Sequence, residues 1–423
     1  MLRMIFKMMA ARKRRYGWLV TELVLVSVVV WGLLDPVVVL SSIESMPDGF
    51  DRRNLYCVTL AEYSADAPRY QSPGQNFMAA RENMWRLLEK VRRYEGVESA
   101  TFLGSTAPYS QSSVMQRFRK DTLETEAWGL FFVPGSDYFK TFRFDEVGGQ
   151  TNEELDRLLQ HESDGTAEFC VISEAAFPGQ SVKGWVDTVY HHRIVGTTSM
   201  VRMRGGGVPM PVATVPVSPN NSGNSLLVRV RDGVDESDFL PAFTEWARKQ
   251  LRAGNYYVRG VQTYEDIIEK DMKEVHQHFR VRSILGVFFL FCLFLGVTGT
   301  FWMQTRSRRE EIGIMKSFGA TRNMVMRIFL IEGFVLTTLA VAVACFLYLQ
   351  YALKEGLYNP LPNSGNNLNI LGGARFWFEH FQQHFTVISL LTWVLLLVVV
   401  CIGIYLPARG ICRIPPTDAL REE

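Results

Sequence analysis

The chain has 423 residues, of which 48% are hydrophobic and 21% are charged, and its formal net charge at pH 7 is +2. The near-neutral net charge by itself says nothing about nucleic acid. The small basic excess lies beside apolar segments, where membrane topology explains it, and this explanation is favoured over nucleic-acid binding. The mean hydropathy is close to zero. Apolar character is therefore concentrated in a few segments, and the rest of the chain forms a sizeable soluble part.

The first apolar segment predicts a transmembrane helix over residues 18–40, after a cytoplasmic N-terminus over residues 1–17. Such a helix needs about 20 predominantly apolar residues. A cleaved secretory signal would also follow a basic run, but this segment is long for one, and Ser41-Ser-Ile-Glu44 is a poor cleavage site. We therefore expect the segment to be retained as a membrane anchor.

Residues 41–280 predict a large extracytoplasmic domain in which a strand–helix–strand pattern occurs twice. The spacing of apolar residues predicts strand 55–60, helix 77–94 and strand 97–103, and then strand 225–231, helix 236–251 and strand 255–261. Two such units commonly join in one open sheet with helices on one face. We expect a porter-like subdomain over residues 50–107 and 223–268, with a mostly β subdomain inserted over residues 108–222.

Two cysteines of this domain could meet in an oxidising compartment. Cys57 and Cys170 each lie in a short apolar, strand-like run. Two buried free thiols are therefore favoured over a disulfide, although the pairing stays open.

Three further transmembrane helices are predicted over residues 281–303, 324–349 and 385–407. They enclose a charged segment at 304–323 and a loop at 350–384, and a short tail follows at 408–423. Basic residues precede the first span, lie between the second and third, and follow the fourth. Because Lys and Arg resist translocation, all three clusters and both termini are expected on the cytoplasmic side.

The charged segment between the second and third spans is expected to be a helix at the membrane surface, where it can touch a partner protein. Ile312, Met315 and Gly319 share one face, with Ile314 and Phe318 beside them. A glycine such as Gly319 is typical of a helix C-terminus in the left-handed conformation. The alternative is an interfacial helix that only anchors the loop.

Two acids lie inside the predicted spans, Glu22 and Glu332. An intramembrane acid is a candidate functional residue. Both are near the cytoplasmic ends of their spans, however, and pairing with Arg327 or with an N-terminal basic residue is favoured.

No enzyme signature is complete. Residues 179–184 resemble the start of a phosphate loop, but Trp185 stands where lysine should follow the second glycine. The histidines at 191, 192, 276 and 278 lack further ligands at metal-binding spacing. We therefore expect neither catalysis, nor metal, nor cofactor on this chain.

The segment from Arg309 to Ala320, followed by Phe329-Leu-Ile-Glu-Gly333, resembles the FtsX/MacB-like permeases of ABC transporters. The carboxyl end resembles the closing signature of that family through Pro407, Ala408, Arg409, Pro416, Ala419, Leu420 and Arg421. In the large domain, residues 133–139, 171–176 and 194–196 resemble looser landmarks, while residues 142–149 and Thr197-Thr198 depart from them.

The resemblance implies a membrane subunit without ATPase activity, in the type VII or mechanotransmission superfamily. It implies a dimer of permease chains, each engaging a separate ABC ATP-binding subunit that carries ATP and magnesium. The coupling residues it implies are Arg309, Glu310, Glu311, Gly313, Lys316, Gly319 and Ala320.

The expected fold is four transmembrane helices plus an α+β extracytoplasmic domain, in a bacterial inner membrane. The expected action is export or extraction of a peptide, lipid-linked or amphipathic substrate. Alternatives are a regulator that activates a cell-wall hydrolase and a membrane sensor. The cargo, the choice between homodimer and heterodimer, and docking of a periplasmic or outer-membrane partner stay open.

Overall fold

The computed structural model describes residues 13–70, 77–110, 112, 114–161, 163–217, 224–307, 309–360 and 376–411. They form two compact units. Of the described residues, the helical unit contains those up to Ser42, those of Gln277–Asn359 and those from Phe376 onward, and the α+β unit contains those of Ile43–His276.

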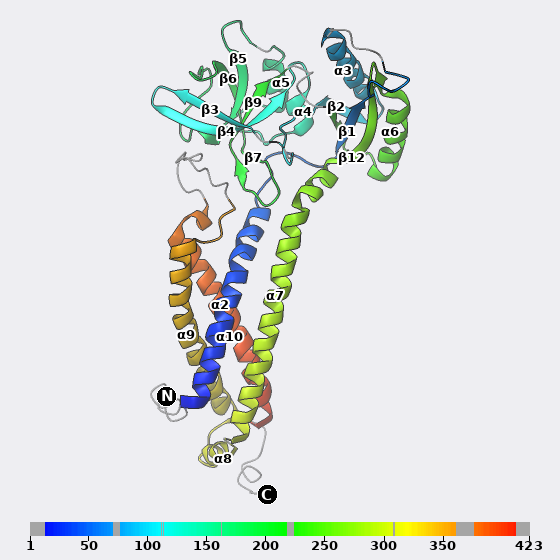
Figure 1. Cartoon of the computed structure of the whole chain (residues 1–423). Coiled ribbons are helices and arrows are strands. Elements are labelled where there is room, and N and C mark those ends of the chain that lie inside the picture. The colour runs from blue at the N-terminus through cyan, green and yellow to red at the C-terminus, as the bar shows by residue number, and fades with distance from the viewer. Residues whose placement is uncertain are drawn as a thin grey trace. The chain divides into compact units, whose positions relative to one another are not determined.

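Long helices dominate the first unit (Figure 1). They are α2 (Lys13–Glu44), α7 (Tyr264–Ser307), α9 (Arg322–Glu355) and α10 (Phe381–Ile411), with the short α8 (Arg309–Ser317) and the 3₁₀ turn η3 (Trp377–Glu379). Within the described ranges, four helices are long and apolar enough to cross a membrane. The expected membrane fold class is confirmed. Helix α7 begins at Tyr264, well before the predicted span at 281, because its charged first half continues the same helix.

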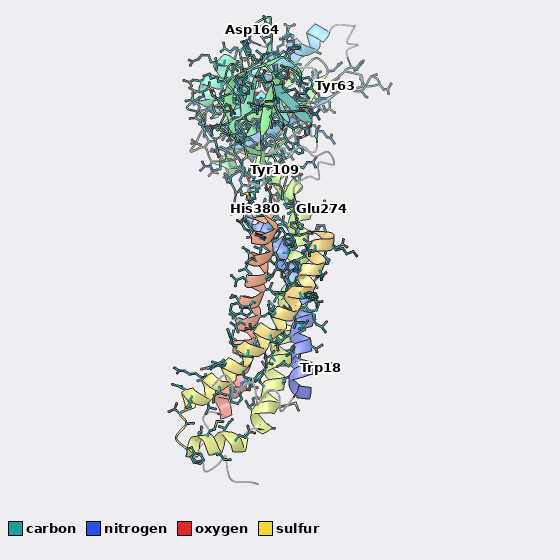
Figure 2. The ribbon with its side chains drawn as sticks, turned by 90° about the vertical axis from the view of Figure 1, so that its left-hand side faces the viewer. Trp18, Tyr63, Tyr109, Asp164, Glu274 and His380 are labelled. Atoms are coloured by element: carbon teal, nitrogen blue, oxygen red, sulfur yellow. The ribbon has the colours of Figure 1, made fainter. Side chains whose placement is uncertain are left out.

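One buried core holds the helical unit together. It contains Leu23 of α2, Val297 of α7, Ile312 of α8, Phe329 of α9 and Ile404 of α10. Small residues allow the close crossings that membrane helices need. A Cβ built at Gly333 of α9 would lie 2.2 Å from Cδ1 of Ile404, so a larger side chain there would separate α9 from α10. Trp18 and His380 lie at opposite ends of this unit (Figure 2).

The first sheet of the α+β unit has the order β11-β12-β1-β10-β2, and all neighbours are antiparallel. Its strands are β1 (Leu55–Glu62), β2 (Val97–Phe102), β10 (Ser225–Val230), β11 (Arg252–Ala253) and β12 (Tyr256–Thr263). Helices α3 (Phe77–Arg92) and α6 (Glu236–Gln250) pack on it through Leu87, Leu88 and Phe243. The two predicted strand–helix–strand units therefore interleave in one sheet, as expected.

The inserted region is mostly β, as predicted. Its five-stranded sheet has the order β3-β4-β9-β5-β6, and a two-stranded sheet joins β7 to β8. The strands are β3 (Met115–Lys120), β4 (Leu123–Phe132), β5 (Glu168–Ser173), β6 (His192–Thr198), β7 (Val201–Arg202), β8 (Pro209–Met210) and β9 (Val212–Pro216). Three short helical segments accompany them: α4 (Tyr138–Phe142), α5 (Asn152–Leu158) and η1 (Glu174–Ala176).

Cys57 lies in β1 and Cys170 in β5, and both are buried free thiols. Burial raises the pKa of Cys57 to about 11 and raises that of Cys170 further. Both sulfurs are therefore protonated and unreactive at neutral pH.

A buried arginine joins the two subdomains. Arg229 of β10 is fully buried, and its guanidinium donates to the carbonyl oxygens of Thr141 (2.6 Å), Arg53 (2.7 Å) and Phe142 (3.1 Å). The Asp51 carboxylate lies 3.7 Å from it. Because a rigid fork of donors satisfies several carbonyls at once, Arg229 fixes α4 and the segment before β1 to the first sheet.

Candidate functional site

Helix α8 follows α7 and lies at the end of the helical unit where α2 begins and α10 ends (Figure 1). The charged segment of the sequence analysis is thus a separate nine-residue helix. The side chains of Arg309 and Glu310 lie outside the described part. Glu311 is exposed, Lys316 and Ala320 are half-buried, and Gly313 is buried.

A Schellman motif ends α8. Gly319 has a φ of +90°, its N–H donates to the carbonyl of Lys316 (3.0 Å), and the N–H of Ala320 donates to that of Met315 (3.0 Å). No atom lies within 4 Å of a Cβ built at Gly319, so this position needs glycine for its backbone conformation. The left-handed end predicted from sequence is confirmed.

Helix α9 starts immediately after this cap. The Thr321 hydroxyl accepts a hydrogen bond from the Met324 N–H at 3.3 Å. A side-chain N-cap of this kind satisfies one of the free N–H groups of a first helical turn. The chain therefore turns from α8 into α9 within a few residues.

The two faces of α8 differ in burial. Ile312 is 2% exposed and belongs to the core of the helical unit, and Met315 packs against that core. Ile314 and Phe318 are 49% and 89% exposed. Helix α8 is thus fixed on one side and presents an apolar pair at i, i+4 spacing on another. The sequence analysis placed Ile314 and Phe318 beside the buried face, but the coupling residues implied by the resemblance do not include them.

The two intramembrane acids have different surroundings. Glu22 is half-buried on α2, and a Cβ built at Gly296 of α7 would lie 2.1 Å from its Oε1. The N-terminal basic side chains expected to pair with Glu22 lie outside the described part of the structure, so this pairing stays a prediction. Glu332 of α9 is 1% exposed.

A buried acid–histidine pair was missed by the sequence analysis. Nε2 of His384 lies 2.6 Å from Oδ1 of Asp35, and Nδ1 of His384 lies 2.9 Å from the carbonyl oxygen of Phe378. The other oxygen of Asp35 accepts from the N–H of Tyr358 at 3.0 Å. The pair joins α2 to α10 and to the segment after α9. An aspartate inside one apolar helix and a histidine at the start of another were the available signals.

The carboxyl-terminal motif is described only in part. Pro407 lies inside α10, Ala408 is buried in the shared core, and Arg409 is exposed in the last turn. Pro416, Ala419, Leu420 and Arg421 lie outside the described residues.

Other candidate ligands stay apart from one another. Among the described residues, no three His, Cys, Asp or Glu side chains cluster as a metal site. His192 lies 3.3 Å from Glu168 on the neighbouring strand, and His276 lies 3.3 Å from Glu44. Each of these histidines therefore has a carboxylate neighbour.

Residues 283–416 match the family model described as FtsX-like permease C-terminal. This part of the chain is therefore similar to an FtsX-like permease domain. It includes α8, the Gly319 cap, the buried Gly333 crossing and the start of the carboxyl-terminal motif. The resemblance stated from these motifs is confirmed.

Curated relatives extend the similarity beyond this domain. The chain is 27% identical to macrolide export ATP-binding/permease protein MacB 2 of Aeromonas hydrophila over 48% of this chain and 28% of the relative. It is 23% identical to MacB of Escherichia coli K12 over 77% of this chain and 48% of the relative. It is 24% identical to the ABC transporter permease YtrF of Bacillus subtilis over 42% of this chain and 40% of the relative. The chain thus spans half or less of the length of these relatives.

A search of solved structures finds the periplasmic region of MacB from Actinobacillus actinomycetemcomitans. The match is 13% identical, has a TM-score of 0.31, and covers 54% of this chain and 97% of that one.

Proposed function

We propose that this FtsX-like chain is the permease subunit of an ABC transporter in a bacterial inner membrane. A separate ATP-binding subunit binds and hydrolyses ATP, and this chain converts the resulting motion into movement of its α+β unit. The action is export or extraction of a peptide, lipid-linked or amphipathic substrate. The observation that carries the proposal is α8, fixed to the helical core by Ile312 while Ile314 and Phe318 remain exposed.

The arrangement of the helical unit supports this orientation. The start of α2, helix α8 and the end of α10 share one end of the unit (Figure 1). In the sequence, the three basic clusters lie in these segments or directly beside them. Such clusters stay in the cytoplasm. Helix α2 ends in the α+β unit and helix α7 begins in it. The α+β unit is then extracytoplasmic.

Motion can pass through α8 because its contacts are continuous with the spans. Ile312 shares one core with residues of α2, α7, α9 and α10. Displacement of α8 by a docked ATP-binding subunit must therefore move packed side chains of all four helices, since close-packed cores do not deform freely. Helix α7 continues without interruption from Ser307 back to Tyr264 in the α+β unit. A dimer of permease chains would present two α8 helices, one to each of two ATP-binding subunits.

The apolar pair gives a direct test. Phe318→Asp is expected to abolish or strongly reduce co-purification with the ATP-binding subunit, because an exposed aromatic anchor is replaced by a hydrated charge. Leu123→Asp on the hairpin of β3 and β4 is the matched control, since Leu123 is also exposed (40%) and lies in the other unit. Co-purification and ATPase rate are measured in mild detergent. Equal retention of the subunit by both variants would contradict docking at α8.

A further inference from the structure

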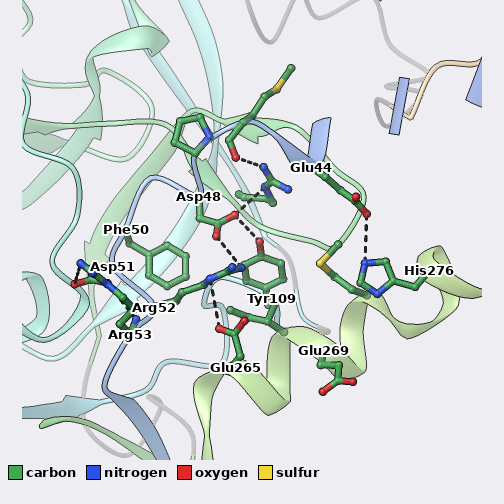
Figure 3. A pocket seen from close by; sticks show the side chains of 15 residues that line it. Glu44, Asp48, Phe50, Asp51, Arg52, Arg53, Tyr109, Glu265, Glu269 and His276 are labelled. Atoms are coloured by element: carbon green, nitrogen blue, oxygen red, sulfur yellow. Dashed lines mark hydrogen bonds and ion pairs between the residues drawn. The ribbon is translucent and has the colours of Figure 1, made fainter. Parts of the chain in front are cut away.

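A cavity of about 560 Å³ lies within the α+β unit (Figure 3). Its lining comes from the segment between α2 and β1, from Tyr109, from Arg202 and from the first turns of α7. Small-molecule sites typically enclose about 300–1,000 Å³ and are largely formed before the ligand arrives. The cavity has the size of such a site, and the role proposed for α8 does not account for it.

Buried polar contacts hold one wall in place. Arg202 is 3% exposed, its Nη2 donates to the carbonyl of Ile43 at 2.8 Å, and its Nε lies 3.0 Å from Oδ1 of Asp48. The hydroxyl of Tyr109 donates to the same carboxylate at 2.8 Å. Burial, and next the charge of Asp48, raise the pKa of Tyr109, so its hydroxyl stays neutral. These contacts fix Arg202 and Tyr109 in place without a ligand.

A second wall is apolar. Phe50, Ile268 and Met272 line the cavity and are 5%, 2% and 8% exposed. Phe50 is held edge-on against Tyr264, with ring centroids 6.0 Å apart, and against Tyr109 at 6.4 Å. Rigid apolar surface of this kind favours an aliphatic or aromatic ligand body.

The remaining charge of the cavity is negative. Its lining contains five carboxylates (Glu44, Asp48, Asp51, Glu265 and Glu269) against three arginines (Arg52, Arg53 and Arg202) and one histidine (His276). Each arginine is already paired, Arg202 with Asp48 at 3.0 Å, Arg52 with Glu265 at 3.4 Å and Arg53 with Asp51 at 3.1 Å.

Two carboxylates remain to receive a ligand. Glu44 lies 3.3 Å from Nε2 of His276, which neutralises it only when the imidazole is protonated. The carboxylate of Glu269 has no ion pair or side-chain hydrogen bond within the described ranges. Figure 3 shows Glu269 on α7 and Glu44, at the end of α2, beside His276. A concave acidic rim beside low-dielectric walls concentrates cations.

We propose that this cavity binds an amphipathic organic cation, with an amine or guanidinium at Glu269 and an apolar body against Phe50, Ile268 and Met272. A charge-assisted hydrogen bond to the carboxylate favours cationic over anionic ligands, and burial of the ligand body against the apolar wall increases affinity. Binding needs neither ATP nor the partner subunit. That the bound cation is cargo rests on the proposed function.

The test compares two fluorescent probes that share one apolar body. Dansylcadaverine carries a primary ammonium and dansyl-6-aminohexanoate carries a carboxylate, and dansyl emission increases in an apolar site. Both are titrated into the full-length protein in nanodiscs without ATP, with empty nanodiscs subtracted. The variants are Glu269→Lys in the cavity and, as a control with the same charge change, Glu95→Lys at an exposed position that does not line it.

Wild type and Glu95→Lys are expected to bind the cationic probe in preference to the anionic one. Glu269→Lys should weaken the cationic probe about tenfold or more, because one charge-assisted contact becomes a repulsion, and should strengthen the anionic probe. Equal binding of both probes by wild type, or equal affinity of Glu269→Lys and wild type for the cationic probe, would overturn the proposal. Since ATP and the partner are absent, neither result depends on docking at α8, and loss of docking in Phe318→Asp leaves this binding test unaffected.

Discussion

At the scale of single residues, Asp35 and His384 form a buried polar contact between α2 and α10. Nε2 of His384 lies 2.6 Å from the Asp35 carboxylate, and Nδ1 lies 2.9 Å from the Phe378 carbonyl oxygen. Asp35 and His384 are 5% and 0% exposed, so water cannot replace either partner.

Removing one partner of this pair should lower the free energy of unfolding of the helical unit. His384→Leu leaves the Asp35 carboxylate buried without its partner, and such a change typically costs about 3–5 kcal/mol. Ser389→Ala is the control, because it removes only the hydroxyl that accepts the Trp31 indole N–H (3.3 Å) between the same two helices and should cost about 1 kcal/mol. Thermal unfolding of both variants in nanodiscs measures the difference. Similar unfolding temperatures of the two variants would show that the contact between Asp35 and His384 contributes little to stability.

At the scale of elements, close helix crossings define the membrane unit. Gly333→Leu should destabilise the crossing of α9 and α10 by about 1–3 kcal/mol, since it inserts a side chain into a packed core. Gly299→Leu on α7 is the matched control, because no atom lies within 4 Å of a Cβ built there. Thermal unfolding in detergent checks the prediction, and equal stability of the two variants would contradict the packing of α9 on α10.

The elements themselves were largely predictable from sequence, because their signals are local. The repeated strand–helix–strand pattern, the apolar spans and the glycine that ends α8 each depend on neighbouring residues. The start of α7 at Tyr264 was not predictable, since its charged first half resembles a soluble helix. The Asp35–His384 pair and the cavity also escaped prediction. Both depend on contacts between residues far apart in the chain, such as Arg202 with Ile43 at the cavity. No local sequence pattern predicts such contacts.

At the scale of the whole molecule, the proposal depends on which side of the membrane each unit faces. Helices α2 and α7 each run from the helical unit into the α+β unit, so motion of the helical unit can pass along them. Helix α8 can receive a cytoplasmic ATP-binding subunit only if it faces the compartment opposite to the α+β unit. The docking of Phe318 and the transmission of motion both require this separation.

Labelling of single cysteines with a membrane-impermeant maleimide tests this central claim most directly. In a chain whose six native cysteines are replaced by alanine, Ser317→Cys on α8 and Lys183→Cys in the α+β unit provide exposed labelling positions. In intact spheroplasts, the account predicts labelling at residue 183 alone, with residue 317 reacting only after the membrane is permeabilised. Labelling of both positions in intact spheroplasts would contradict it.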